Sequence, residues 1–108
     1  MLEKELQKAV VELAHRFGWM VAHFGKAIGG HGAERWITPA AYDAKGFPDL
    51  VLVRGRLMFR ELKVGKNDLS FEQRRWIEWL RNARVDAAVW TEDDWKSGLI
   101  ERELRDMQ

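Results

Sequence analysis

A pair of apolar runs joined by a very short turn constrains this chain more than any other feature of its sequence. The runs are Asp49–Val53 and Leu57–Val64, and Gly55 stands between them. Apolar runs of this length predict β-strands, and so short a connection is most simply made between antiparallel neighbours. The sequence therefore predicts a β-hairpin over residues 49–64.

Two carboxylates and a lysine stand inside these apolar runs. Asp49 begins the first run, and Glu61 and Lys63 lie two positions apart in the second. Side chains alternate across a strand, so Glu61 and Lys63 share one face. Asp49 joins them on that face if the turn leaves an odd number of residues unpaired. An even turn would place the two carboxylates on opposite faces.

The odd register also creates a continuous apolar face. With residues 54–56 unpaired, Asp49 lies opposite Glu61 at the far end of that face. Four apolar residues then line the rest of it: Val51, Val53, Leu57 and Phe59. We expect this face to pack against the core.

Two acids held side by side at the edge of a core require an explanation. They repel each other and are costly to desolvate unless a cation joins them. Two carboxylates, a strand carbonyl and waters are the oxygen ligands that suit Mg²⁺. The alternative is a salt bridge from Lys63 to Glu61 or Asp49 at the end of the strand.

A glutamine in the next predicted helix is also out of place. Gln73 falls in the middle of the apolar stripe formed by Trp76, Ile77 and Leu80, so it faces inward. Ser70 and Gln73 have the spacing of a capping box, which accounts for the glutamine without a site. The same side chain can cap the helix and also line a site.

Helices and strands are predicted on both sides of the hairpin. Helical spacing of apolar residues predicts helices over residues 2–17, 70–82 and 92–106, and short apolar runs predict strands over 19–24 and 85–90. Residues 25–47 show no sustained period, so we predict no helix or strand there. The order α-β-β-β-α-β-α predicts an α/β fold with a mixed central sheet flanked by helices.

The composition fits a single soluble domain, which we place at residues 1–108. A chain of 108 residues with 46% hydrophobic residues can form one core. The absence of cysteine excludes disulfide frameworks, thiolate metal sites and thiol nucleophiles. The formal net charge of +1 neither favours nor excludes a nucleic-acid partner. No apolar run is long enough to cross a membrane, so we expect no membrane partner and a cytoplasmic protein.

The charged residues of the hairpin resemble a known nuclease motif. Pro48-Asp49, followed after eleven residues by Glu61-Leu62-Lys63, resembles the core of the PD-(D/E)xK nucleases. The wider context is similar to the virus-type replication-repair nuclease (VRR-NUC) family over nearly the whole chain, most clearly in the run GFPDLVLVRGRLMFRELKVGKNDLSFEQRRWIEWL. The resemblance implies a restriction-endonuclease-like α/β core.

The resemblance also implies a metal-dependent site. In that family an Asp, a Glu and the carbonyl after it bind a divalent metal, a Lys assists, a Gln opens the next helix, and a Glu near the N-terminus completes the site. Carried over by position, these residues are Asp49, Glu61, Leu62 through its backbone carbonyl, Lys63, Gln73 and Glu3. The implied cofactor is Mg²⁺, for which Mn²⁺ can substitute. The implied products are a 5′-phosphate and a 3′-hydroxyl.

The N-terminal acid has more than one candidate. Helix geometry favours Glu3, which lies on the flank of the apolar stripe with Gln7 one turn further on. Glu5 and Glu12 lie nearby in sequence and point away from the stripe. An acid at a helix start is also favoured by the helix dipole alone, so Glu3 has a purely structural explanation as well.

The implied partner is DNA, and six basic residues flank the implied site in sequence. We expect them to contact phosphates, although each alone has the ordinary explanation of a solvated surface charge. They are Lys26, Arg35, Lys45, Lys66, Arg74 and Arg75.

Short members of the family resemble homodimers that cleave branched DNA such as Holliday junctions, as in phage and bacterial DNA repair. The two-fold symmetry of a four-way junction matches an isologous dimer. Phe71 and Trp79, together with Trp90 or Trp95, are our candidates for the contact, and a monomer is the alternative. Two rival functions remain: a catalytically inactive nucleic-acid-binding module on the same fold, and a restriction-type duplex nuclease.

Overall fold

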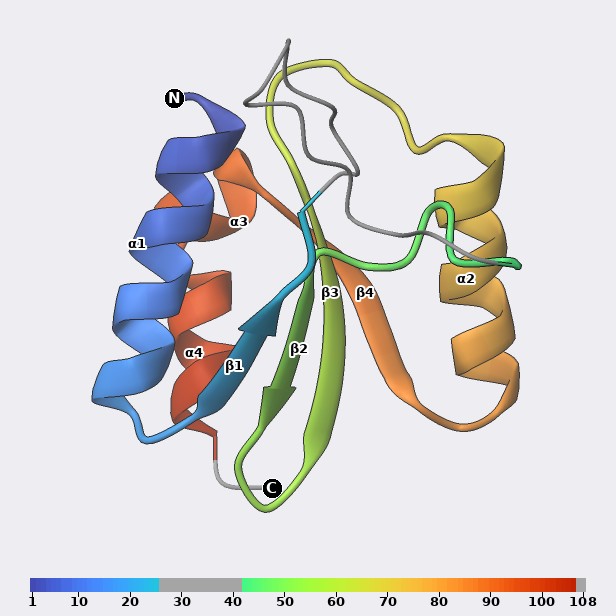
Figure 1. The fold of residues 1–108 in the computed structure, drawn as a ribbon. Coiled ribbons are helices and arrows are strands. Elements are labelled where there is room, and N and C mark those ends of the chain that lie inside the picture. The colour runs from blue at the N-terminus through green and yellow to red at the C-terminus, as the bar shows by residue number, and fades with distance from the viewer. Residues whose placement is uncertain (26–41, 107–108) are drawn as a thin grey trace, which may run out of the picture.

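A four-stranded mixed sheet forms the centre of the computed structural model, which describes residues 1–25 and 42–106 (Figure 1). Its strands are β1 (Met20–His23), β2 (Leu50–Val53), β3 (Leu57–Lys63) and β4 (Asp86–Thr91). They lie side by side in chain order. The first three are antiparallel neighbours, and β4 runs parallel to β3.

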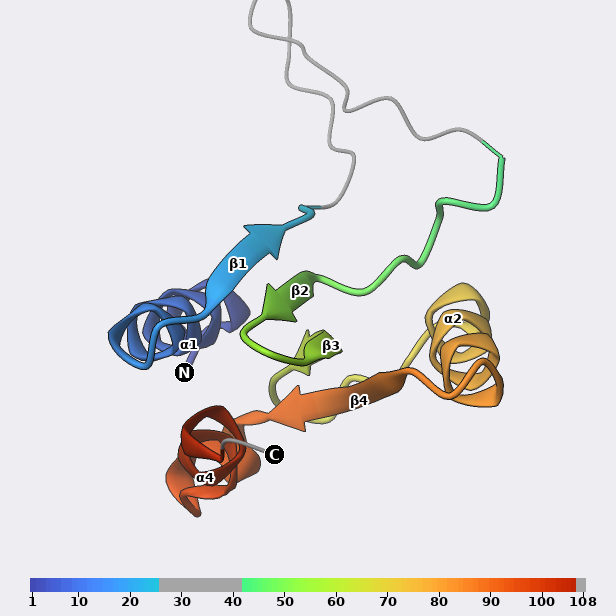
Figure 2. The ribbon, with the colours of Figure 1, turned by 90° about the horizontal axis from the view of Figure 1, so that it is seen from below.

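Helices cover both faces of this sheet. They are α1 (Glu3–Arg16), α2 (Phe71–Asn82), α3 (Glu92–Lys96) and α4 (Leu99–Arg105). Figure 2 shows α1 and α4 on one face and α2 on the other. The predicted α/β class with a mixed sheet flanked by helices is confirmed.

The predicted odd register of the hairpin is also confirmed. Val53 pairs with Leu57 and Val51 with Phe59, so three residues form the turn. Gly55 adopts a φ of +69°, a conformation that glycine tolerates without strain. The turn is closed by a hydrogen bond from the N–H of Arg54 to the carbonyl of Arg56, 3.0 Å long.

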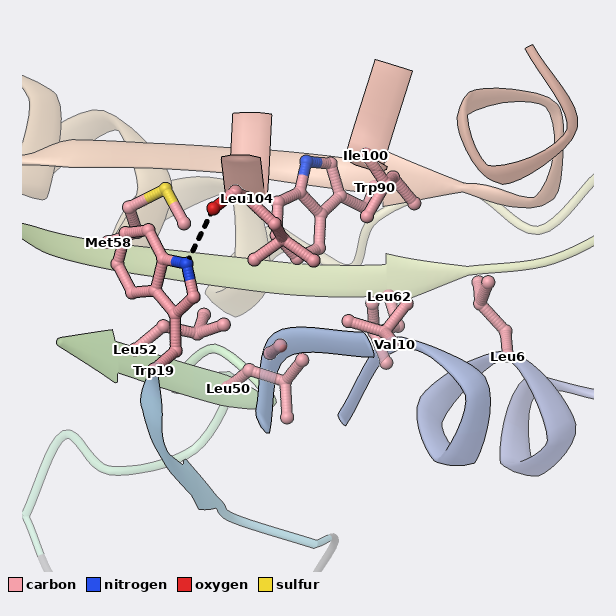
Figure 3. Packing of buried hydrophobic residues seen from close by; sticks show 11 residues of the cluster. Leu6, Val10, Trp19, Leu50, Leu52, Met58, Leu62, Trp90, Ile100 and Leu104 are labelled. Atoms are coloured by element: carbon pink, nitrogen blue, oxygen red, sulfur yellow. Dashed lines mark hydrogen bonds between the residues drawn. The ribbon is translucent and has the colours of Figure 1, made fainter. Parts of the chain in front are cut away.

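The main core lies on the opposite face from the one that we predicted. Val53 and Leu57, expected inside, are 41% and 42% exposed. The buried residues alternate with them and point toward α1 and α4: Leu50, Leu52, Met58 and Leu62 (Figure 3). The reason is that α1 and α4 together bring two apolar stripes to this face, whereas α2 is the one helix of the described residues on the other face.

Tryptophans complete this core and correct another prediction. Trp90, a candidate for a dimer contact, is almost fully buried, and Trp95 packs against the same cluster. Trp19 is buried beside them, and its indole N–H donates to the carbonyl of Leu104 at 2.7 Å (Figure 3). Trp90 therefore offers no free surface, and Trp95 is partly covered by the core.

The last predicted helix is two helices. α3 and α4 are separated at Gly98, which has a φ of +85°. A left-handed glycine ends an α-helix, and the sequence signal for it was present in Ser97-Gly98. The break lets α4 turn back and place Ile100 and Leu104 in the core.

The segment that precedes β2 packs closely on the start of α2. Gly46 has a φ of +85°, and a Cβ there would lie only 2.5 Å from the carbonyl carbon of Glu72. The neighbouring Phe47 contacts Phe59 and Trp76 edge to face, with ring centroids 5.9 and 5.0 Å apart. These contacts hold β2, β3 and α2 in a fixed arrangement.

Candidate active site

The two carboxylates predicted to share a face lie together at one end of the hairpin. Continuing the register one step beyond the Leu50–Arg60 pair places Asp49 opposite Glu61. Both side chains are buried. The backbone N–H of Leu62 donates to Oδ2 of Asp49 at 2.8 Å, which fixes the carboxylate against β3.

Gln73 reaches this pair from the first turn of α2. Its Nε2 donates to Oε2 of Glu61 at 3.0 Å. Its Oε1 accepts from the backbone N–H of Ser70, and Ser70 Oγ accepts from the Gln73 N–H, so the predicted capping box is confirmed. The glutamine is a helix cap and a contact of the carboxylate at once.

The electrostatics at Glu61 favour its neutral form. Burial, the negative charge of Asp49 and a hydrogen bond between the two carboxyl groups raise its pKa to about 8. The positive charge of Lys63 lowers the pKa, and the charge of Glu3 raises it, both more weakly. Ionised carboxylates only accept hydrogen bonds, so two of them can stay in contact only by sharing a proton or a cation.

One oxygen of this pair lacks a partner. Oε1 of Glu61 is buried and has no hydrogen-bond donor within the described residues. A buried polar atom without a partner costs about 1–3 kcal/mol. A hard divalent cation between the two carboxylates would satisfy this oxygen and remove their repulsion, so the donor set fits Mg²⁺.

Lys63 follows the pair on β3 and shares its face. Among the described residues it forms no ion pair within 4.0 Å, so the predicted alternative of a salt bridge to Glu61 or Asp49 is not observed. Its side chain is half-buried. The positive charge of Lys63 is therefore close enough to lower the pKa of Glu61, although Lys63 forms no ion pair with either carboxylate.

A pocket of about 280 Å³ opens beside Asp49 and Leu62 and extends to α1. Glu3 and Gln7 line it, whereas Glu5 is exposed and accepts a hydrogen bond from the N–H of Leu2. Of the candidate N-terminal acids, the structure thus brings Glu3 to the pocket. Within residues 1–25 and 42–106, no three His, Cys, Asp or Glu side chains gather closely enough to form a metal site by themselves.

Comparison with known families decides what kind of domain carries this pocket. The family model of the VRR-NUC domain matches residues 3–93. The chain belongs to the VRR-NUC family. No curated protein and no solved structure matches it. VRR-NUC is a family of nuclease domains, so the family implies nuclease activity with DNA as the partner.

The pocket of this VRR-NUC domain also contains residues that sequence reasoning missed. Lys4 and His23 line it opposite Leu62, together with Gly25. The spacing of His23 from the other histidines matches no metal motif in the sequence. Only the pairing of β1 with β2 brings it to the site, since His23 pairs with Leu50. No local signal could have revealed this.

The basic residues proposed to contact DNA are distributed unevenly. Lys45, Lys66 and Arg74 are exposed, and Arg75 is half-buried over the ring of Phe71. Lys26 and Arg35 lie outside the described residues. None of the helices that the structure describes has the length and apolar character to cross a membrane.

Proposed function

We propose that this VRR-NUC domain is a Mg²⁺-dependent endonuclease with a PD-(D/E)xK-type core. The observation that carries the proposal is the buried pair Asp49 and Glu61, in which one carboxylate oxygen has no hydrogen-bond partner among the described residues. Like charges buried together are unfavourable in a purely structural role and are typical of functional sites. A divalent cation is the simplest group that makes such a pair favourable.

Each residue of the site has a role that follows from its contacts. Asp49 and Glu61 would hold the ion, with the carbonyl of Leu62 and, less directly, Glu3. A bound Mg²⁺ supplies charge neutralisation at the phosphate and a more acidic water. The Leu62 N–H keeps Asp49 in place, and Gln73 orients Glu61. Lys63, which has no ion-pair partner among the described residues, donates to the phosphate or to the attacking water and offsets negative charge as it develops.

The finer substrate preference is for branched DNA such as a four-way junction. A chain of 108 residues contains one such site, so symmetric cleavage of both strands requires two copies. An isologous homodimer places two identical sites across a two-fold axis. With Trp90 and Trp95 in the core, the exposed Phe71 at the start of α2 is the residue that we place at the contact.

Cleavage of a panel of junctions, flaps and duplexes tests the proposal. We expect cleavage in Mg²⁺ or Mn²⁺, none in excess EDTA, and a preference for the branched substrates. Glu61→Ala should lose at least about 1000-fold in rate while still folding, because its removal relieves a repulsive cluster. Glu5→Ala is the matched control, since it removes an exposed acid outside the pocket. Full activity of Glu61→Ala would contradict the role that we give to Glu61, and binding without cleavage by the wild type would identify a DNA-binding module.

Lys63→Ala tests the role of the ammonium separately from that of the metal ligands. We expect cleavage to be lost to a similar extent while Mn²⁺ still binds, as measured by calorimetry. The physical reason is that the variant keeps both carboxylates and removes a positive charge close to the ion. Loss of Mn²⁺ binding in this variant would contradict the role that we give to Lys63.

A further inference from the structure

A second pocket lies on α2, outside the carboxylate site. It measures about 210 Å³ and is lined by Asp43, Arg75, Trp76 and Trp79. The indole N–H of Trp76 donates to the carbonyl of Asp43 at 2.9 Å, which fixes the Trp76 ring in the wall. Trp79 is 71% exposed although it lines the pocket, so most of its indole remains uncovered by the described residues.

Both walls of this pocket belong to chain segments that also carry residues of the active site. Along one wall, Asp43 lies six residues before Asp49; along the other, Trp79 lies six residues after Gln73. Six helical residues span about 9 Å along the axis, which corresponds to about three nucleotides of a stacked strand. Phe47 joins the walls by packing against Trp76, with ring centroids 5.0 Å apart.

The chemistry of the pocket suits a flat, hydrogen-bonding ring. An exposed indole offers a stacking surface, and a guanidinium offers a planar cation that also stacks. The Arg75 guanidinium lies 3.9 Å from the Asp43 carboxylate, and that carboxylate is largely exposed, so it can still accept from an exocyclic amine. Four of the described residues line the pocket, whereas a stable protein interface has about 20–30 residues on each side. A single planar group fits these features better than a second copy of the chain does.

We propose that this pocket binds one unpaired nucleobase of the DNA strand that crosses the active site. The inference rests on the proposed nuclease function and deepens it. Branched DNA has unpaired or easily unstacked bases at its branch point, and base stacking on aromatic side chains tolerates any sequence. Arg74, exposed beside the pocket, adds a positive charge for the neighbouring phosphate. The pocket then explains how a domain without a base-reading module selects structure rather than sequence.

A double-mutant cycle between protein and DNA tests this assignment. The protein change is Trp79→Ala, and the DNA change removes one base at each position within three nucleotides of the cut. Affinity for the junction is measured with Ca²⁺ in place of Mg²⁺, so that the DNA is bound and not cut. At one position we expect each single change to weaken binding about 10-fold, because stacking on Trp79 is lost in either case. The two changes together should cost no more than either alone.

Two variants serve as controls for this cycle. Met20→Ala removes an equally exposed side chain, 72% exposed, from β1 and should leave the affinity unchanged. Trp79→Phe keeps an aromatic ring and should restore most of the binding. Additive costs at every position, or no effect of Trp79→Ala, would overturn the inference while wild-type cleavage leaves the proposed function intact.

Two further results would also overturn it. If Trp79→Ala splits a dimer in sedimentation and the abasic positions have no effect, a second copy covers the pocket. If the wild-type protein neither binds nor cleaves any DNA of the panel, the proposed function fails together with the inference.

Discussion

Arg60 and Glu61 are consecutive residues of β3 that are both buried, yet their surroundings differ completely. Their side chains point to opposite faces of the sheet and are 3% and 2% exposed. Each therefore represents a charge removed from water within the same strand. They differ in the charge of the groups that surround them.

Arg60 is surrounded by partners of opposite charge. It pairs with Asp86 at 2.9 Å and with Glu103 at 3.1 Å, and its guanidinium lies 5.0 Å from the ring centre of Trp90. Trp90 in turn donates to Glu103 at 3.0 Å. This cluster ties α4 to β3 and β4, so the arginine has a structural role.

Glu61 is instead placed next to another acid and has a single neutral donor, Gln73. A buried charge with opposite partners contributes to the fold, whereas one with a like-charged neighbour needs something that is not part of the chain. The contrast within two residues indicates that the site end of β3 is arranged for a ligand rather than for stability.

Arg60→Ala should have the largest effect on the fold. Removal of the guanidinium leaves Glu103 without its ion-pair partner and Asp86 with Arg56 alone, which we expect to lower the free energy of unfolding by about 3 kcal/mol. Urea denaturation measures the change. Arg74→Ala, which removes an exposed arginine, should change it by less than about 0.5 kcal/mol. Equal losses of unfolding free energy in the two variants would contradict the structural role that we give to Arg60.

Glu61→Gln should have a smaller effect of opposite sign that depends on pH. The pKa of Glu61 is raised from 4.5 to about 8, so the folded state holds this proton more tightly than the unfolded state does. The free energy of unfolding that this proton contributes is fully present below pH 4.5 and is lost as the pH rises toward 8. Without metal, we expect the glutamine variant to match the wild type near pH 4 and to become the more stable of the two as the pH rises to 8. A variant that is less stable at both pH values would show that the ionised carboxylate is already satisfied.

Gln73→Ala should have the smallest effect on stability and separates the two roles of this residue. Loss of the cap costs about 1 kcal/mol, and Ser70→Ala should cost about the same. Only Gln73→Ala also removes the donor to Glu61, so we expect only this variant to lower the cleavage rate, by about 10-fold. In Ser70→Ala the backbone N–H still holds Gln73 in place. Equal cleavage rates in the two variants would mean that the glutamine is only a cap.

Several features could be predicted because their causes lie within a few residues. The hairpin register depends on a three-residue turn and on the alternation of side chains, so the pairing of Asp49 with Glu61 followed from the sequence. The inward direction of Gln73 followed from helical spacing and its cap from Ser70. The broken last helix was missed although Gly98 signalled it, because the apolar period continues across the glycine.

Other features depend on contacts between distant segments. Nothing near Lys4 or His23 indicates that they line a pocket with Asp49, because that contact requires α1 and β1 to pack beside β2. The burial of Arg60 likewise depends on Glu103, which lies more than forty residues further along the chain.

The sequence by itself determined which residues share a strand face and which ends of helices are capped, because alternation, helical period and turn length are local properties of the backbone. The tertiary structure alone decided which face of the sheet is the core. Both faces of the hairpin carry apolar residues, and the choice depended on where α1 and α4 pack. That packing placed Arg60 among acids and left Glu61 beside Asp49, because burial of a charge has meaning only through the groups that surround it.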